Sequence, residues 1–188
     1  MCKIVYLTSR CLDTPSRHFR DVLADELRNR NIEVVTDSTC YIKKIFRREH
    51  TYGMAIAIDF FRDDGNGCGL TLNQRCSYIS RDFAYSISNM LDEVTPRIRW
   101  RDFKFVENCD KTWKLFFEKV NSETKAIFYL CTYTDSVDYD LFMTKFDTVV
   151  HRFADEIVRC LRSNYDIADY QKRIKLAKIK RKNNGLVE

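Results

Sequence analysis

The chain has 188 residues, of which 45% are hydrophobic and 13% aromatic, with only five glycines and two prolines. This composition is enough for one packed domain and argues against long disordered linkers. No apolar run reaches the length that spans a membrane, and the opening MCKIVYLTSR has too short an apolar segment for a secretory signal peptide. We therefore expect one domain located in the cytoplasm.

The net charge of +5 comes from one segment near the C-terminus. KRIKLAKIKRK, residues 172–182, holds seven of the 32 basic residues and no acidic one, so the rest of the chain, with 27 acidic residues, is close to neutral. Such a segment is suited to contact nucleic acid, an anionic membrane surface or an acidic protein, or to form a solvated helix. The cations concerned are Lys172, Arg173, Lys175, Lys178, Lys180, Arg181 and Lys182.

Eight cysteines and three histidines raise the question of disulfides or zinc. No two cysteines form a C-x-x-C pair, and the histidines do not stand at zinc-finger spacing from them. We therefore expect free thiols in a reducing compartment. Two cysteines have positions that would suit a nucleophile, Cys11 in a polar loop and Cys131 at the end of a predicted strand.

The first third of the chain predicts a strand–helix–strand unit. KIVYLT at 3–8 and IEVVTD at 32–37 are apolar runs of strand length, and the apolar residues of HFRDVLADELRNRN at 18–31 recur at helical spacing. Strands joined by a helix in this way normally pair in parallel. A short helix at 41–50 follows, and then MAIAIDFF at 54–61, an almost continuous apolar run that is typical of a strand buried on both faces.

The rest of the chain continues this alternation. GLTLN at 69–73 predicts a short edge strand, and YISRDFAYSISNMLDEV at 78–94 predicts an amphipathic helix that ends before Pro96. Two more strands are expected at 98–106 and 125–133, and two more helices at 111–121 and 136–164. The last helix would bury the apolar stripe Leu141, Phe142, Phe146, Val149, Val150, Phe153, Ile157 and Leu161.

These elements predict a single three-layer α/β domain over residues 1–165, with a mainly parallel central sheet of about six strands flanked by helices. Residues 166–188 then form a basic C-terminal helix or tail. Ligands of open α/β sheets bind at the carboxyl ends of the parallel strands. The ligand-site candidates in the loops that leave those ends are Arg10, Cys11, Asp13, Asp59, Arg62 and Cys131.

Two stretches carry a resemblance to a known enzyme family. MAIAIDFFRDDGNGCG stands where type-3 N-acetylmuramoyl-L-alanine amidases have a strand with a motif like S-I-H-x-N and a glycine loop. AIFYLCTYTDSVDYDLF stands where they have a strand resembling L-V-E-x-x-F-x-x-N and a helix. The order of elements over roughly residues 3–164 is similar to that family, whose members are zinc enzymes that cut peptidoglycan. The resemblance implies an amidase-like α/β fold.

The family's functional residues are replaced at the matching positions. SRCLD follows the first strand where the family has G-H-G-G, and Asp13 is the nearest counterpart of a glutamate ligand. The histidine of the third strand falls on Asp59, and the catalytic glutamate falls on Leu130 or Cys131. The three histidines, His18, His50 and His151, all lie elsewhere in the sequence.

This departure decides the expected function. A catalytic zinc usually has three protein ligands, commonly with histidine among them, and metal-assisted hydrolysis needs a general base near the metal-bound water. Asp13 and Asp59 alone suit magnesium or calcium better, so they are the candidates for a divalent cation, and no other cofactor is indicated. We expect a non-catalytic or repurposed amidase-like protein that binds a protein, a nucleic acid or a small ligand.

Two further expectations belong to that reading. An accessory protein of a phage or another mobile element, working in the host cytoplasm, fits because the fold is frequent in phage lysis enzymes. The alternative is a cytosolic metal-dependent amide hydrolase with diverged ligands.

The candidate residues also predict a local arrangement. If the loops form a site, Asp13, Asp59 and Cys131 converge at the carboxyl edge of the sheet. Two ionised carboxylates repel each other unless a cation lies between them. We expect an arginine to take that place, with Arg10, Arg17 and Arg62 as the candidates.

Overall fold

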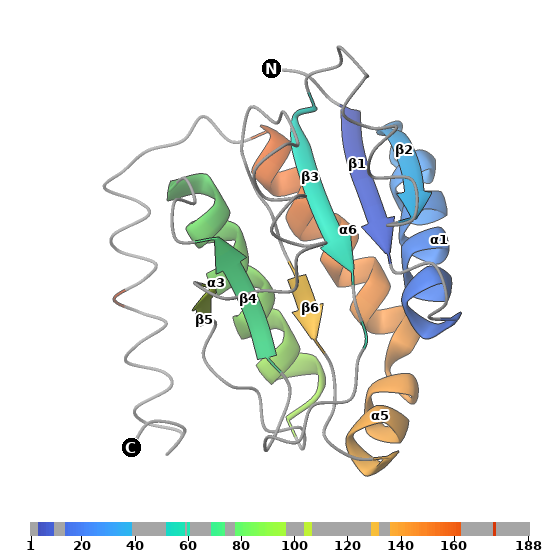
Figure 1. The fold of residues 1–188 in the computed structure, drawn as a ribbon, viewed down its shortest axis with the longest axis vertical. Helices are drawn as coiled ribbons and strands as arrows, with labels where there is room; N and C mark the ends of the chain where they lie inside the picture. The colour runs from blue at the N-terminus through green and yellow to red at the C-terminus, as the bar shows by residue number, and fades with distance from the viewer. Residues whose placement is uncertain are drawn as a thin grey trace.

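The computed structural model describes residues 4–9, 14–38, 52–58, 60, 69–73, 78–96, 104–106, 129–131, 136–162 and 175. Within these ranges, six strands form one sheet in the order β2-β1-β3-β6-β4-β5 (Figure 1). The strands are β1 (Ile4–Ser9), β2 (Glu33–Ser38), β3 (Met54–Ile58), β4 (Gly69–Asn73), β5 (Lys104–Val106) and β6 (Tyr129–Cys131).

Most neighbouring strands of this sheet are parallel. β1 pairs in parallel with both β2 and β3, and β3 pairs in parallel with β6. β4 runs antiparallel to β6 and pairs in parallel with β5, so its arrow points the opposite way in Figure 1. The predicted class, a mainly parallel sheet of about six strands, is confirmed. The prediction that GLTLN is an edge strand is wrong, because β5 pairs with the outer side of β4.

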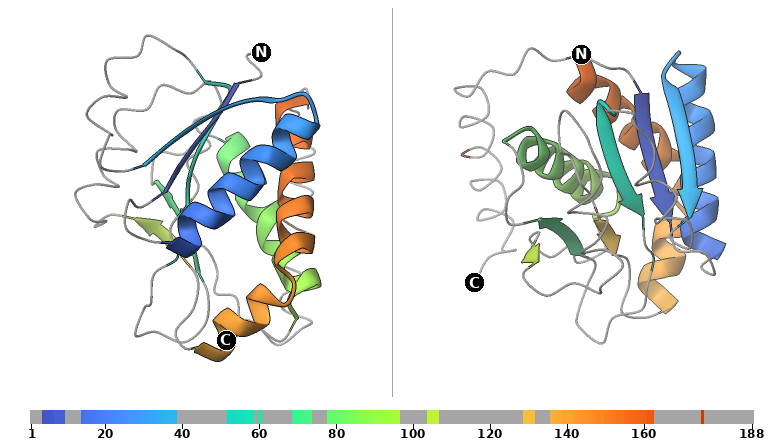
Figure 2. Two further views of the ribbon diagram at one scale, coloured as in Figure 1. Left: turned by 90° about the vertical axis from the view of Figure 1, so that its right-hand side faces the viewer. Right: turned by 45° about the horizontal axis from the view of Figure 1, so that its top comes forward.

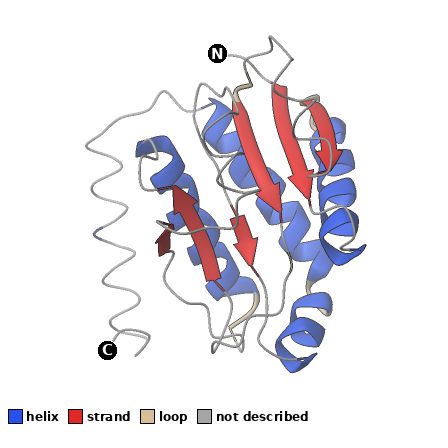
Figure 3. Ribbon diagram, viewed as in Figure 1, coloured by secondary structure: helices blue, strands red, loops and turns tan. Residues whose placement is uncertain are grey.

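The helices are α1 (Thr14–Asn29), α3 (Tyr78–Val94), α5 (Ser136–Met143) and α6 (Phe146–Arg162). Figures 2 and 3 show α1, α6 and α3 on one face of the sheet, and α6 contacts both of the others. The helices predicted at 41–50 and 111–121 lie outside the described residues. Across the part of the chain that the structure describes, no helix is both long and apolar enough to cross a membrane.

Local chemistry explains where α1 begins and ends. Its start carries Thr14-Pro15, and proline fits the first helical turn because that turn needs no amide donor there. After its last residue, Asn31 takes a left-handed conformation with φ of 60°, which asparagine tolerates better than most residues. The N–H groups of Arg30 and Ile32 both donate to the carbonyl of Leu27, at 3.0 and 3.1 Å. α1 therefore runs from Thr14 to Asn29, whereas the apolar spacing predicted a helix at 18–31.

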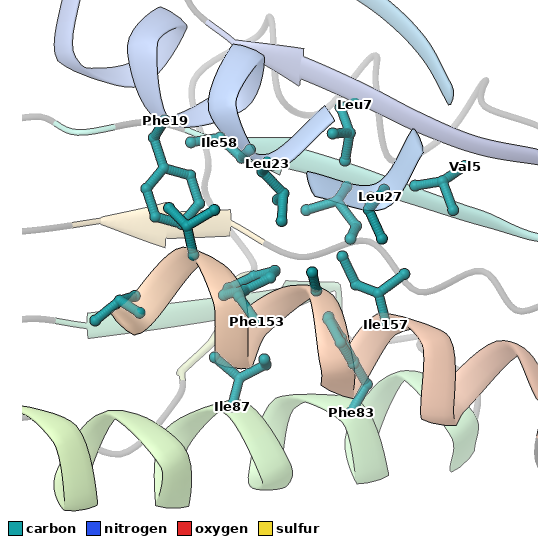
Figure 4. Close-up of a cluster of buried hydrophobic side chains, with 14 of the residues drawn as sticks. Val5, Leu7, Phe19, Leu23, Leu27, Ile58, Phe83, Ile87, Phe153 and Ile157 are labelled. Atoms are coloured by element: carbon teal, nitrogen blue, oxygen red, sulfur yellow. The ribbon is translucent and has the colours of Figure 1, made fainter. Parts of the chain in front are cut away.

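The core lies between the sheet and this helical layer (Figure 4). Alternate residues of β1, Val5 and Leu7, point toward the helices and join the core cluster. Phe153 of α6 is fully buried and makes edge-on ring contacts with Phe19 of α1 at 5.7 Å and Phe83 of α3 at 5.8 Å. This one ring therefore joins all three helices of the layer.

The single helix predicted at 136–164 is wrong, because the structure has two helices there. α5 ends at Met143 and α6 begins at Phe146. At the break, the Thr144 hydroxyl donates to the carbonyl of Leu141 at 2.7 Å, and the Lys145 N–H donates to that of Phe142 at 3.0 Å. The predicted apolar stripe is confirmed, since every member is buried except the half-buried Leu141. The domain boundary predicted at 165 lies outside the described residues and stays a prediction.

Candidate functional site

The carboxyl ends of four parallel strands meet at one edge of the sheet. In the register of the sheet, Ser9 of β1 pairs with Ser38 of β2 and with Ile58 of β3. Ile58 in turn pairs with Leu130 of β6, so Cys131 stands one residue beyond this row. We call this edge the carboxyl edge; it is where an α/β sheet offers its ligand site.

Ser16 in the first turn of α1 ties the end of β3 to that helix. Its side chain is fully buried, and its Oγ accepts a hydrogen bond of 2.6 Å from the backbone N–H of Phe60. The Phe60 ring packs against the rings of Phe19 and Phe142, each at a centroid distance of 5.4 Å. Phe60, just after β3, is thus fixed both by its backbone N–H and by the packing of its ring.

Arg20, one turn further along α1, ties the ends of β1 and β2. Only 11% of its side chain is exposed. One terminal nitrogen, Nη1, donates to the Ser9 Oγ at 3.1 Å and to the carbonyl oxygen of Asp37 at 2.7 Å. The other terminal nitrogen and Nε donate to Asp21 Oδ1 at 2.6 and 2.8 Å, which orients the guanidinium plane.

The sequence-predicted site residues lie mostly outside the described ranges. Cys131 is the last residue of β6, and its backbone pairs with Gly69 of β4. The other five lie outside the described residues, so their convergence stays a prediction: Arg10, Cys11, Asp13, Asp59 and Arg62. Of the tail, Lys175 alone is described, and it is exposed.

Within the described ranges, the arginine buried at the carboxyl edge is Arg20, which the sequence analysis did not predict. Arg17, one of the three arginines expected there, is exposed on α1. No local signal in the sequence marks Arg20 as a residue of this edge, because its partners Ser9 and Asp37 belong to strands that only the fold brings to α1.

Neither of the two described histidines lies in a strand end. The His18 ring of α1 stacks on Phe146 at 4.9 Å with an interplanar angle of 11°, and its residue is exposed. His151 of α6 is 62% exposed, and its Nδ1 lies 2.8 Å from Glu26 Oε1. His50 lies outside the described residues.

His151 belongs to an ionic cluster that joins α1 to α6. Arg30 donates to Glu26 and, at 3.0 Å, to Asp155 Oδ1. Hydrogen bonds from Arg30 and then from His151 hold the pKa of Glu26 below its usual value. Burial alone would lower the pKa of Arg30, but its bonds to Glu26 and Asp155 outweigh that effect and the pKa is raised. The cluster joins the C-terminal half of α1 to α6, whereas the contacts of α1 with the carboxyl edge are made by Ser16 and Arg20 in its first half.

A second polar group joins α3 to α6. Both terminal nitrogens of Arg159 lie 3.3 Å from Asp82 Oδ2, and one of them donates to the Ser86 Oγ at 2.8 Å. Nε of Arg159 donates to Glu156 at 2.7 Å. Next to this group, burial raises the pKa of the Cys160 thiol to about 12, so it is neutral under ordinary conditions.

The described residues do not supply a zinc site. Among them, no group of three or more histidine, cysteine, aspartate or glutamate side chains is arranged to hold a metal ion. At the carboxyl edge, the Ser9 hydroxyl accepts a hydrogen bond from Arg20, whose guanidinium is paired with Asp21. Asp13 and Asp59, which the sequence matches to two of the family's ligand positions, lie outside the described residues, so the replacement of the zinc centre stays a prediction.

The fold described above is that of N-acetylmuramoyl-L-alanine amidases, which confirms the resemblance seen in the sequence. The chain superposes on the catalytic domain of the CD27L endolysin targeting Clostridia Difficile with a TM-score of 0.58 at 14% identity, over 87% of this chain and 99% of that one. For the amidase AmiC2 of Nostoc punctiforme, the TM-score is 0.58 at 8% identity, over 86% and 98%. For the CwlD amidase from Clostridioides difficile, in complex with the GerS lipoprotein, it is 0.53 at 11% identity, over 92% and 98%.

No protein-family model and no curated protein sequence matches the chain. Identities this low establish the shared fold and leave the activity to be argued from the residues.

Proposed function

We propose that this chain is an amidase-fold protein that binds a partner instead of hydrolysing peptidoglycan. The observation that supports this most strongly is Arg20, whose guanidinium is buried at the carboxyl edge, bonded to Ser9 and Asp37 and paired with Asp21, so that protein groups fill this part of the edge. The positions of His18 and His151 on helices, each against a different neighbour, agree with the loss of a zinc centre.

The ligand site of this proposal lies at the carboxyl edge. Arg10 follows Ser9 directly, and Asp59 lies between Ile58 and Phe60, so the candidates are adjacent in sequence to residues at that edge. Asp13 precedes α1 by one residue, and Cys131 ends β6. Cys11 and Arg62 complete the set. We propose that these side chains contact a polar ligand or a loop of a partner protein.

Hydrolysis is tested directly. Purified protein should release no peptide from muramoyl-peptide substrates, with or without added zinc. The control is Asp25→Ala, which changes an exposed carboxylate on α1. Zinc-dependent cleavage that is abolished by Asp59→Ala and kept in Asp25→Ala would instead establish the alternative, a metal-dependent hydrolase with diverged ligands. The likeness to amidase structures over almost their whole length is the observation that favours this alternative.

The basic tail is the second contact region of the proposal. Its seven cations suit an anionic partner, and the test is the affinity of the full chain for DNA and RNA at two salt concentrations. Counterion release makes such binding weaken steeply as salt rises. The control is a full-length variant with glutamine at all seven positions. Equal or undetectable binding by both chains would remove nucleic acid from the possible partners.

Origin in a phage or another mobile element and a cytoplasmic location stay predictions.

A further inference from the structure

Two side chains of α1 contact the ends of three neighbouring strands. Ser16 and Arg20 are four residues apart, so they lie on the same face of the helix, one turn from each other. Ser16 bonds the residue that follows β3 by two positions, and Arg20 bonds the last residue of β1 and a carbonyl of β2. We call this pair the α1 clamp.

The bonds of the α1 clamp are buried or partly buried, and they are long-range in sequence. The Ser16–Phe60 bond joins residues 44 positions apart, and the bonds of Arg20 join residues 11 and 17 positions apart. A buried N–H such as that of Phe60 loses its water on folding, so the serine oxygen is needed to satisfy it. All of these partners are groups of the chain itself, and none of the bonds requires a bound ion.

We propose that Ser16 and Arg20 are positioning residues of the ligand site, holding the ends of β2, β1 and β3 in place without a metal. This inference rests on the proposed function in one respect, the location of that site at the carboxyl edge. Ser16 holds the backbone at Phe60, and Arg20 holds Ser9 and the carbonyl of Asp37. The end of β3 and the ends of β1 and β2 therefore have separate anchors.

Limited trypsin digestion followed by mass spectrometry separates the two anchors. Arg62 lies two residues beyond Phe60, and Arg10 lies next to Ser9, so cleavage after each arginine reports the release of the neighbouring strand end. Ser16→Ala should raise the cleavage rate after Arg62 about fivefold, the factor expected for one lost hydrogen bond, and leave cleavage after Arg10 unchanged. Arg20→Met should do the reverse.

Matched variants keep the test specific. Ser16→Thr retains the hydroxyl acceptor and should restore slow cleavage after Arg62. Arg28→Met removes an exposed arginine from the same helix and should change neither site. Amide exchange of Phe60, measured by NMR, should become faster in Ser16→Ala while that of Leu23 in the middle of α1 stays slow.

Three results would overturn the α1 clamp. Equal acceleration at both arginines in either variant would mean a general loss of stability, and no acceleration would mean that the bonds do not hold the strand ends. In the wild-type chain, faster cleavage at both sites with EDTA and protection by zinc would mean that a metal holds them. None of these depends on the muramoyl-peptide assay, so failure of the binding proposal is recognised separately.

Discussion

Two ion pairs between α3 and α6 have the same separation but different surroundings. Asp82 and Arg159 are 3.3 Å apart, with 9% and 29% of their side chains exposed. Glu93 and Arg152 are also 3.3 Å apart, with 54% and 47% exposed. We predict that Asp82→Asn destabilises the protein much more than Glu93→Gln, although each change removes one negative charge from α3.

The magnitude follows from the separation and the burial. At 3.3 Å, two unit charges attract by about 5 kcal/mol at the effective dielectric constant of a partly buried site and by about 1 kcal/mol in water. Desolvation offsets part of the larger figure, and Arg159 keeps its bond to Glu156 in the variant. We therefore expect a loss of about 2 kcal/mol for Asp82→Asn and of less than about 0.5 kcal/mol for Glu93→Gln.

Urea unfolding followed by far-ultraviolet circular dichroism measures both losses. Added sodium chloride should remove the small effect of Glu93→Gln, because exposed pairs are screened, and should leave most of the effect of Asp82→Asn. Equal losses for the two variants, or a loss for Asp82→Asn that disappears in high salt, would refute the argument from burial.

Three more outcomes follow from the described contacts. The pKa of Glu26 is lowered from 4.5 in the folded chain, so the ionised side chain stabilises the fold above pH 4.5 and this contribution is lost as the pH falls through the lowered value. Glu26→Gln should therefore reduce the fall of the urea midpoint that acid causes. Phe153→Ala should cost about 3–5 kcal/mol, measured in the same unfolding assay, because it empties the site where three helices meet; a cost below about 1 kcal/mol would contradict the packing. Cys160, with its pKa raised to about 12, should react with iodoacetamide at pH 8 only after unfolding in urea, as judged by peptide mass spectrometry.

The break between α5 and α6 shows one limit of prediction from the sequence. Phe142 and Phe146 are four residues apart, so the apolar spacing continues across Thr144 as though the helix did. What interrupts the helix is a set of local bonds, among them the Thr144 hydroxyl to the carbonyl of Leu141. By contrast, α3 has the residue range that its periodicity predicts, since both its ends lie at the limits of a clear apolar stripe.

The carboxyl edge shows a second limit. Loop order and strand direction predict where a site lies, and the register of β1 with β2 and β3 confirms that their ends coincide. No local pattern marks Arg20 as buried, because an arginine on an amphipathic helix is normally solvated. Its burial depends on Ser9 and the carbonyl of Asp37, which only the folded sheet brings to it. In the same way, the place of β4 inside the sheet depends on β5, which follows α3 in the chain.

The place of β6 in the sheet has a consequence for synthesis on the ribosome. β6 pairs with β3 on one side and with β4 on the other, yet residues 74–128 separate it from β4 in the sequence. During translation, β3 and β4 therefore emerge well before the strand that joins them, and each then has an open edge that another nascent chain can pair with. The five residues MAIAI of β3 are apolar and uncharged, the composition most prone to such pairing. We expect co-translational chaperones to be needed from the emergence of β3 until β6 and the helix that follows it have been made.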